Sequence, residues 1–253
     1  MILCYHDVDD SWQSPLAVTP DRFREHCAWL AESGRVEHLG QVLGDLDEDF
    51  LSKDRRVALT FDDGLAGVYD HALESLTEQR LPFAVYIVAA TLKPEGQPVD
   101  WVDGMEGAGL RTMTRTQIAE LLSEGAEIGS HTWRHADLTT LTPDECLDDL
   151  RRSREFLEDM FGVPVPTLAY PRGRHNEHVR RAAAEAGYEF ALALPEQPEP
   201  FGPHAVPRVG VYASNGRTGL AIKSSRAFWK ARLSPVYPAM RSAVRVGYRM
   251  LGR

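Results

Sequence analysis

The segment Val57-Ala58-Leu59-Thr60-Phe61-Asp62-Asp63-Gly64 is an apolar run that ends in two acidic residues and a glycine. The run predicts a buried strand, because strands covered on both faces are apolar throughout. Gly64 permits a sharp turn after the acidic pair. Adjacent residues leaving a strand point to opposite sides, so one carboxylate can reach a metal ion while the other faces water and substrate. The alternative is an ordinary acidic turn.

Strands and helices alternate along the rest of the chain. Strands are expected at about 2–5, 57–61, 82–88, 126–129, 167–170, 190–194 and 206–211, and helices at about 20–33, 69–79, 114–124, 143–160 and 176–186. This order predicts an α/β fold with a mainly parallel sheet. About seven strands favour a distorted (β/α) barrel, although periodicity alone does not exclude an open sheet. We expect the barrel to occupy residues 1–212 and a basic amphipathic tail to occupy 213–253.

Polar or special residues follow several of these strands directly. They are His6, Asp62, Asp63, His131 and Pro171. In a β/α barrel the C-terminal strand ends converge on one face, where active sites form. The sequence therefore predicts one site at this rim.

His131-Thr132-Trp133-Arg134-His135 provides two imidazoles four residues apart, a separation that places both on one side of a helical turn. Zinc accepts neutral imidazole nitrogen and carboxylate oxygen, and three protein ligands leave an open position for chemistry. Asp63, His131 and His135 are thus the predicted ligands, with Asp62 left to take a proton from water. Two surface histidines in a loop are the alternative.

Residues 60–64 and 131–135 resemble the first two motifs of the polysaccharide deacetylases, carbohydrate esterase family 4. The resemblance covers about residues 1–212. It implies a distorted β/α barrel that removes N-acetyl groups from amino sugars with a bound divalent metal. It also implies Asp62 as catalytic base and Asp63, His131 and His135 as metal ligands.

The third family motif is altered in this chain. The family carries an arginine before Pro-x-Gly and uses it to orient the catalytic aspartate, but no arginine lies between Gly162 and Pro171. Arg208 is our candidate replacement, and a surface arginine leaving a loop is the alternative. By similarity, the backbone N–H of Tyr170 would stabilise the oxyanion.

The opening Tyr5-His6-Asp7 resembles the circularly permuted branch of the family, typified by poly-N-acetylglucosamine deacetylases. In that branch the general acid is a histidine from the N-terminal strand, so the resemblance implies that His6 protonates the leaving amine. A polar rim residue or a hydrogen-bonded core histidine is the alternative. Trp101 lies in an irregular segment, where it could stack on a sugar or hold the loop against the core.

The amino-acid composition argues against some kinds of site and against one class of partner. The three cysteines form no CxxC pair, so neither a disulfide framework nor a cysteine zinc site is indicated. The formal charge is −9, and residues 217–253 contain nine Lys or Arg and no Asp or Glu, so residues 1–216 carry −18. Such an acidic body argues against nucleic acid as a partner.

The basic tail has two interpretations. Met240, Val244, Tyr248 and Leu251 share one helical face, and Arg241, Arg245 and Arg249 form a row of their own. Basic amphipathic helices lie on anionic membranes, or the tail docks on the acidic barrel of its own protein. No signal peptide is visible, so we expect a cytoplasmic protein, with the inner face of the membrane as its place of action if the tail binds there.

The sequence thus predicts a metal-dependent N-deacetylase acting on an N-acetylated glycan or glycolipid. The ligand set suits Zn²⁺, but Ni²⁺, Co²⁺ or Fe²⁺ would also be accepted. Two alternatives remain: hydrolysis of another sugar amide such as a formamide, and an inactive barrel that binds carbohydrate.

Overall fold

The computed structural model describes residues 1–45, 56–101, 109–195, 201–232 and 234. Its main sheet has the order β10-β1-β4-β5-β6-β7-β8-β9, and every neighbouring pair is parallel. The strands are β1 (Ile2–Tyr5), β4 (Ala58–Phe61), β5 (Phe83–Ile87), β6 (Glu127–Ser130), β7 (Thr167–Ala169), β8 (Phe190–Ala193), β9 (Val206–Pro207) and β10 (Val209–Gly210). A short pair, β2 (Asp7–Val8) and β3 (Ala17–Val18), lies apart from it.

The two edges of the main sheet meet at Arg208. This residue alone separates β9, which pairs with β8, from β10, which pairs with β1. The expected strand over 206–211 is therefore split between the two edges, and the sheet forms a nearly closed barrel. The predicted distorted (β/α) barrel is confirmed.

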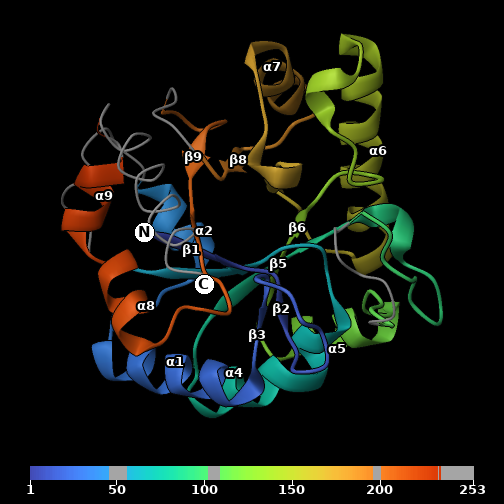
Figure 1. Cartoon of the computed structure of the whole chain (residues 1–253). Coiled ribbons are helices and arrows are strands. Elements are labelled where there is room, and N and C mark those ends of the chain that lie inside the picture. Colours follow the sequence, from blue (N-terminus) through green and yellow to red (C-terminus); the bar gives the residue numbers. More distant parts are fainter. Residues whose placement is uncertain (46–55, 102–108, 196–200, 233, 235–253) are drawn as a thin grey trace.

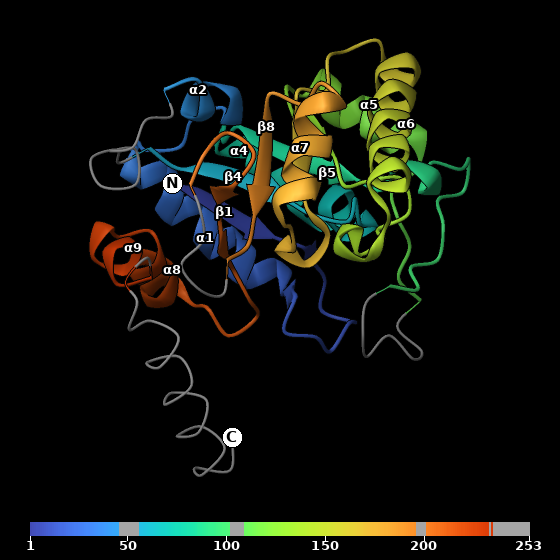
Figure 2. The same cartoon turned by 90° about the horizontal axis from the view of Figure 1, so that it is seen from above.

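Helices surround the sheet (Figures 1 and 2). They are α1 (Pro20–Ser33), α2 (Leu39–Gly44), α4 (Leu73–Glu78), α5 (Arg115–Ser123), α6 (Pro143–Phe161), α7 (Glu177–Glu185), α8 (Arg217–Lys223) and α9 (Arg226–Arg232). A π-helical turn, Val68–Ala72, precedes α4, and 3-10 turns cover Ala89–Thr91, Leu138–Thr140 and Pro171–Gly173. The short helix α2 was not predicted. Among the described residues, no helix is long and apolar enough to cross a membrane.

Local signals position these helices. Thr114 and Thr142 each form a capping box with the residue three positions on, at the starts of α5 and α6. Gly34 ends α1 in a left-handed conformation with φ 60°.

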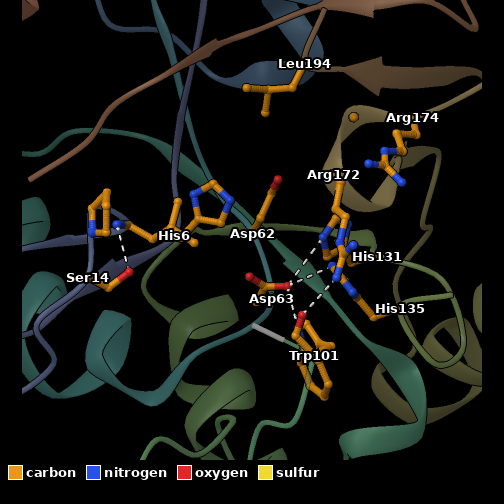
Figure 3. Close-up of a pocket in the computed structure, with 13 residues that line it drawn as sticks. His6, Ser14, Asp62, Asp63, Trp101, His131, His135, Arg172, Arg174 and Leu194 are labelled. Atoms are coloured by element: carbon orange, nitrogen blue, oxygen red, sulfur yellow. Dashed lines mark hydrogen bonds and ion pairs between the residues drawn. The ribbon is translucent and has the colours of Figure 1, made fainter. Parts of the chain in front are cut away.

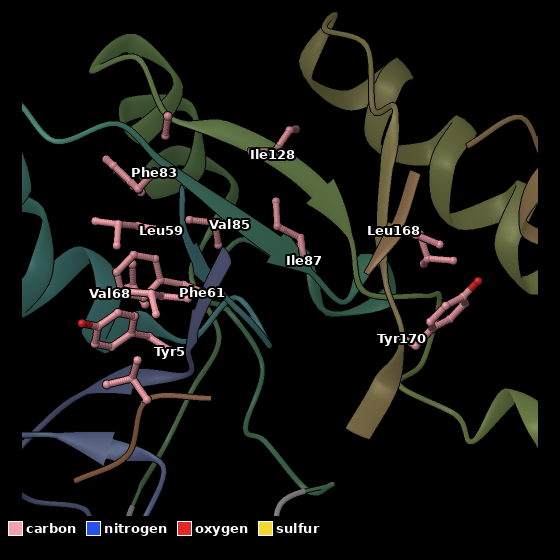
Figure 4. Close-up of a cluster of buried hydrophobic side chains, with 14 of the residues drawn as sticks. Tyr5, Leu59, Phe61, Val68, Phe83, Val85, Ile87, Ile128, Leu168 and Tyr170 are labelled. Carbon is pink, nitrogen blue, oxygen red and sulfur yellow. The ribbon is translucent and has the colours of Figure 1, made fainter. Parts of the chain in front are cut away.

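The alternation of side chains along the strands divides the core into two layers. Outward-facing residues pack beneath the helices, as Figure 4 shows for Tyr5, Leu59, Phe61, Val85 and Ile87. Inward-facing residues fill the barrel: Ile2, Ala58, Ala84, Tyr86, Ala169, Leu192 and Val206. Because side chains alternate with a period of two, Cys4, Thr60 and Asp62 continue the inward row toward the rim.

The described part of the predicted tail packs on the barrel. Leu220 of α8 and Trp229 of α9 are buried in the main core cluster. Arg217 pairs with Glu32 at 3.3 Å, and the Lys223 ammonium donates to the Gly210 carbonyl at 2.6 Å. For these two helices the contacts match the docked arrangement. Residues 235–253, with the face formed by Met240, Val244, Tyr248 and Leu251, lie outside the described residues.

Candidate metal centre and active site

Three of the predicted site residues converge at the rim of the barrel (Figure 3). Asp63 Oδ1 lies 3.5 Å from His131 Nε2 and 3.3 Å from His135 Nε2, and all three side chains are buried. Donor atoms of the three residues all lie within 4.8 Å of one another. A tetrahedral ion with bonds of about 2.1 Å places its ligand atoms roughly 3.4 Å apart, so this donor set fits a divalent metal such as zinc.

Neighbouring groups orient these side chains and favour the neutral form of His135, as metal binding requires. His131 Nδ1 lies 2.8 Å from the Ala169 carbonyl oxygen, which holds a proton on Nδ1 and leaves the Nε2 lone pair toward Asp63. The Trp101 indole N–H donates to Asp63 Oδ1 at 2.9 Å, and its ring stacks on His135 with centroids 5.4 Å apart. Burial, together with the nearby His131, lowers the pKa of His135 to about 4, so the imidazole is in the neutral form that binds metals.

The backbone reaches this arrangement by left-handed turns rather than by a helix. Residues 131–135 contain no helical turn, and Thr132 and His135 have φ of 72° and 58°. The predicted helical turn is therefore wrong. Asp63 also has a positive φ, 69°, so it turns out of the strand toward the histidines while Asp62 continues the inward row. The Thr132 hydroxyl fixes the loop by accepting the His135 N–H at 2.9 Å.

Asp62 is held by a buried arginine. The Arg208 guanidinium donates from Nη1 to Asp62 Oδ1 at 2.6 Å and from Nη2 to Oδ2 at 2.7 Å. Burial alone would raise the pKa of Asp62, but Arg208 and His131 hold that pKa well below its usual range. Arg208 is 0% exposed, so the surface-arginine alternative is excluded. The structure places Arg208 where the sequence predicted a replacement for the missing motif arginine.

Two further groups inside the barrel complete the surroundings of Asp62. The Cys4 thiol donates to Asp62 Oδ2 at 3.3 Å, and Arg208 Nη1 also donates to the Thr60 hydroxyl at 3.2 Å. Burial raises the pKa of Cys4, so the thiol remains a donor. The sequence contained no sign of this contact, except that Cys4 occupies an inward-facing position in the alternation of its strand.

His6 lies beside Asp62 at the end of β1 and lines the same pocket. Donor atoms of Cys4, His6 and Asp62 lie within 4.8 Å of one another. Burial lowers the pKa of His6, although Asp62 and Asp63 oppose the shift. His6 Nδ1 is buried and has no hydrogen-bond partner among the described residues. This geometry brings His6 within reach of a group bound beside Asp62.

Tyr170 requires a correction. Its backbone N–H donates to the Leu192 carbonyl oxygen at 3.0 Å, which extends the ladder between β7 and β8. Its side chain is buried, and its hydroxyl donates to the His204 carbonyl at 3.0 Å. The amide expected to stabilise the oxyanion is therefore already engaged in the sheet, and in this geometry it is not available to a substrate.

A cavity of about 470 Å³ opens over the site. Its walls include the predicted His6, Asp62, Asp63, His131 and His135, and also residues that were not predicted: Ser14, Leu16, Arg172, Arg174 and Leu194. Trp101 holds its loop against the site through its bond to Asp63, which is the second of the two roles considered for it.

The family model for polysaccharide deacetylase matches residues 52–191. The chain belongs to the polysaccharide deacetylase family. The matched segment contains Asp62, Asp63, His131 and His135, whereas His6 and Arg208 lie outside it. The circular permutation expected from the N-terminal motif stays a prediction.

Individual relatives agree with the family. The putative polysaccharide deacetylase YxkH of Bacillus subtilis is 26% identical over 192 residues, which cover 76% of this chain and 63% of that protein. The peptidoglycan-N-acetylmuramic acid deacetylase PdaA of the same species is 26% identical, over 60% of this chain and 52% of its own length. The chain thus spans less than two thirds of these relatives.

Solved structures share the fold. The Streptococcus pyogenes deacetylase PplD superposes with a TM-score of 0.73 at 22% identity, covering 88% of this chain and 97% of that one. IcaB from Ammonifex degensii gives a TM-score of 0.68 at 21% identity, covering 91% and 96%.

Proposed function

We propose that this protein is a metal-dependent hydrolase that removes the N-acetyl group from an amino sugar of a glycan or glycolipid and releases acetate. The observation that carries the proposal is the adjacency of two different carboxylates in one pocket. Asp63 lies against the imidazoles of His131 and His135, and Asp62 is kept ionised by Arg208. Relatives described as peptidoglycan and chitin deacetylases support the substrate class.

Asp63, His131 and His135 would hold the ion. A bound divalent ion supplies a Lewis acid that polarises the amide carbonyl and lowers the pKa of water. Zn²⁺ is the proposed ion, and Ni²⁺, Co²⁺ and Fe²⁺ suit the same donors. Asp62 faces the same pocket and takes the proton of the attacking water. Its Oδ1 keeps a second lone pair beside its bond to Arg208, whereas Oδ2 accepts from both Arg208 and Cys4.

His6 is the proposed donor of a proton to the departing amine. Its lowered pKa makes the imidazole mainly neutral at pH 7, so it must first gain a proton, and the anionic Asp62 beside it favours the charged form. Arg208 acts through Asp62, by fixing the carboxylate with two parallel hydrogen bonds.

Acetate release from N-acetylated oligosaccharides tests the proposal. Asp62→Asn should lower kcat by at least about 100-fold, and His6→Asn by a similar factor, since general acid–base groups contribute factors of roughly 10² to 10⁴. The exposed Asp21→Asn, on α1 and outside the pocket, is the control. Near-normal turnover by Asp62→Asn would exclude the assignment.

The same assay separates the alternatives. Release of formate from a formylated sugar, but no acetate from an acetylated one, would indicate the other amide. Carbohydrate binding without turnover, in a protein that takes up no zinc, would indicate a binding module.

Membrane contact is a separate proposal, which rests on the basic composition of residues 217–253. The proposal is that these residues hold the enzyme at the inner face of the membrane. Flotation with anionic vesicles of the full chain and of a chain ending at Ser234, which keeps the buried Leu220 and Trp229, would test it. Equal flotation of the two would exclude a role for the tail.

A further inference from the structure

Backbone strain marks Arg172 as one of the site residues. Five described residues other than glycine have a positive φ: Asp63, Arg80, Thr132, His135 and Arg172. Two are proposed metal ligands, and Thr132 lies between the histidines. A left-handed conformation costs such residues roughly 1–2 kcal/mol and persists mainly where function requires it. Arg172, with φ 56°, lines the pocket but has no part in the chemistry derived above.

The turn that carries Arg172 is locked. Gly173 follows with φ 68°, and its N–H donates to the Tyr170 carbonyl at 2.8 Å. A Cβ at Gly173 would lie 2.4 Å from the Leu194 nitrogen, so no other residue fits there. The Arg172 side chain extends toward Trp101, and its charge acts on His135 (Figure 3). The fixed turn thus places the exposed Arg172 at the mouth of the pocket, next to the proposed metal centre.

The charges of the pocket leave Arg172 without an acidic partner. Asp62 is paired with Arg208, and Arg174 is paired with Asp137 at 2.7 Å. Asp63 would be offset by the bound ion. Arg172 makes one hydrogen bond, from Nη2 to the Trp101 carbonyl at 3.4 Å, and among the described residues no carboxylate lies within 4.0 Å of it. An arginine fork matches carboxylate and phosphate oxygens in a bidentate manner.

We propose that Arg172 binds an anionic substituent of the substrate, so that the preferred substrate is an N-acetylated amino sugar carrying a carboxylate or a phosphate close to its acetamide. This inference rests on the proposed deacetylase function and specifies its substrate class. The acidic body strengthens it, because residues 1–216 carry a formal −18 and would repel such a substrate unless the mouth of the pocket supplied a cation.

Three substrates of matched length test the inference with the zinc-loaded full chain: a neutral N-acetylglucosamine oligomer, a glycan containing N-acetylmuramic acid, and an oligomer bearing a phosphodiester. We expect kcat/KM to be roughly 10-fold higher for at least one acidic substrate than for the neutral one, as a charge-assisted bidentate contact would give. The two acidic substrates distinguish carboxylate from phosphate. The preference should shrink as salt is raised, because the contact is at the pocket mouth.

Variants at position 172 complete the test. Arg172→Asn suits the left-handed backbone and should reduce the acidic-to-neutral ratio of kcat/KM toward one, whereas Arg172→Lys should keep part of it. Arg80→Asn is the matched control, since Arg80 is also left-handed, with φ 52°, but is exposed and outside this pocket. An unchanged ratio in Arg172→Asn, or no preference in the unmodified protein, would overturn the inference and leave deacetylation standing. Failure of all three substrates would overturn both.

Discussion

The two halves of the site differ in their position in the barrel and in how their charges are balanced. The metal half, Asp63, His131 and His135, lies at the ends of β4 and β6, inside the segment that the family model matches. The seam half, His6, Asp62 and Arg208, gathers where the barrel closes between β9 and β10. Donor atoms of the metal half lie within 4.8 Å of one another, whereas the seam half contains a buried ion pair between Arg208 and Asp62.

Substitutions in the two halves should therefore have different consequences. A buried ion pair is costly to break, because the remaining charge stays desolvated. The His135 imidazole of the metal half is neutral, so its loss leaves no buried charge that it had balanced. Changes in the seam should therefore alter stability and turnover, while changes in the metal half should alter metal affinity and leave the metal-free fold intact.

The largest effect is expected from Arg208→Met. The variant leaves Asp62 buried and unpaired, so the free energy of unfolding should fall by roughly 3–5 kcal/mol at pH 7. Urea denaturation of the metal-free proteins measures this. Removing both charges in Asp62→Leu/Arg208→Met should cost less than the sum of the two single changes. If the free-energy costs of the two single changes were additive in the double variant, the two halves would not differ as described. Loss of zinc binding by Arg208→Met at unchanged stability would have the same meaning.

The second effect belongs to the metal half. His135→Ala removes a donor, so zinc affinity should fall by more than the roughly 100-fold that loss of an outer-shell partner costs. The free energy of unfolding without metal should change by less than about 1 kcal/mol. Calorimetric zinc titration and urea denaturation give the two values. A large loss of metal-free stability would show that this half also supports the fold.

The third effect concerns Asp7, which follows His6. Burial raises the pKa of Asp7 from 3.8 to about 7, and its Oδ2 has no partner among the described residues. Between about pH 4 and pH 7 the unfolded chain has lost this proton and the folded chain keeps it, so the carboxyl lowers stability as pH rises. Asp7→Asn should remove this loss, on the order of 4 kcal/mol at pH 8 and less than about 1 kcal/mol at pH 4. Equal melting curves of the two proteins at pH 8 would contradict the prediction.

The smallest effect is expected from Trp101→Phe. The variant removes the indole N–H that donates to Asp63 Oδ1, so zinc affinity should fall by roughly 10-fold. Trp133→Phe is the matched control, because Trp133 Nε1 has no partner among the described residues. A similar loss in both variants would mean that ring packing, not the hydrogen bond, supports the metal half.

Much of the fold could be predicted because its signals are local. Apolar runs marked the strands, and threonine caps marked the starts of α5 and α6. The acidic pair and the two histidines were found because each follows a strand end, and parallel strands bring these ends to one rim. Arg208 was predicted from what the third motif lacked, and only its burial against Asp62 shows that it takes that place.

The sequence by itself determined the order of the elements and the identity of the proposed metal ligands and of the candidate base, since both depend on residue type and short-range spacing. Tertiary structure alone decided the rest. Left-handed turns at Asp63, Thr132 and His135 aim the donors, the ladder between β7 and β8 occupies the Tyr170 amide, and closure of the barrel places Arg208 inside. These outcomes depend on contacts between segments far apart in the chain, which no local pattern encodes.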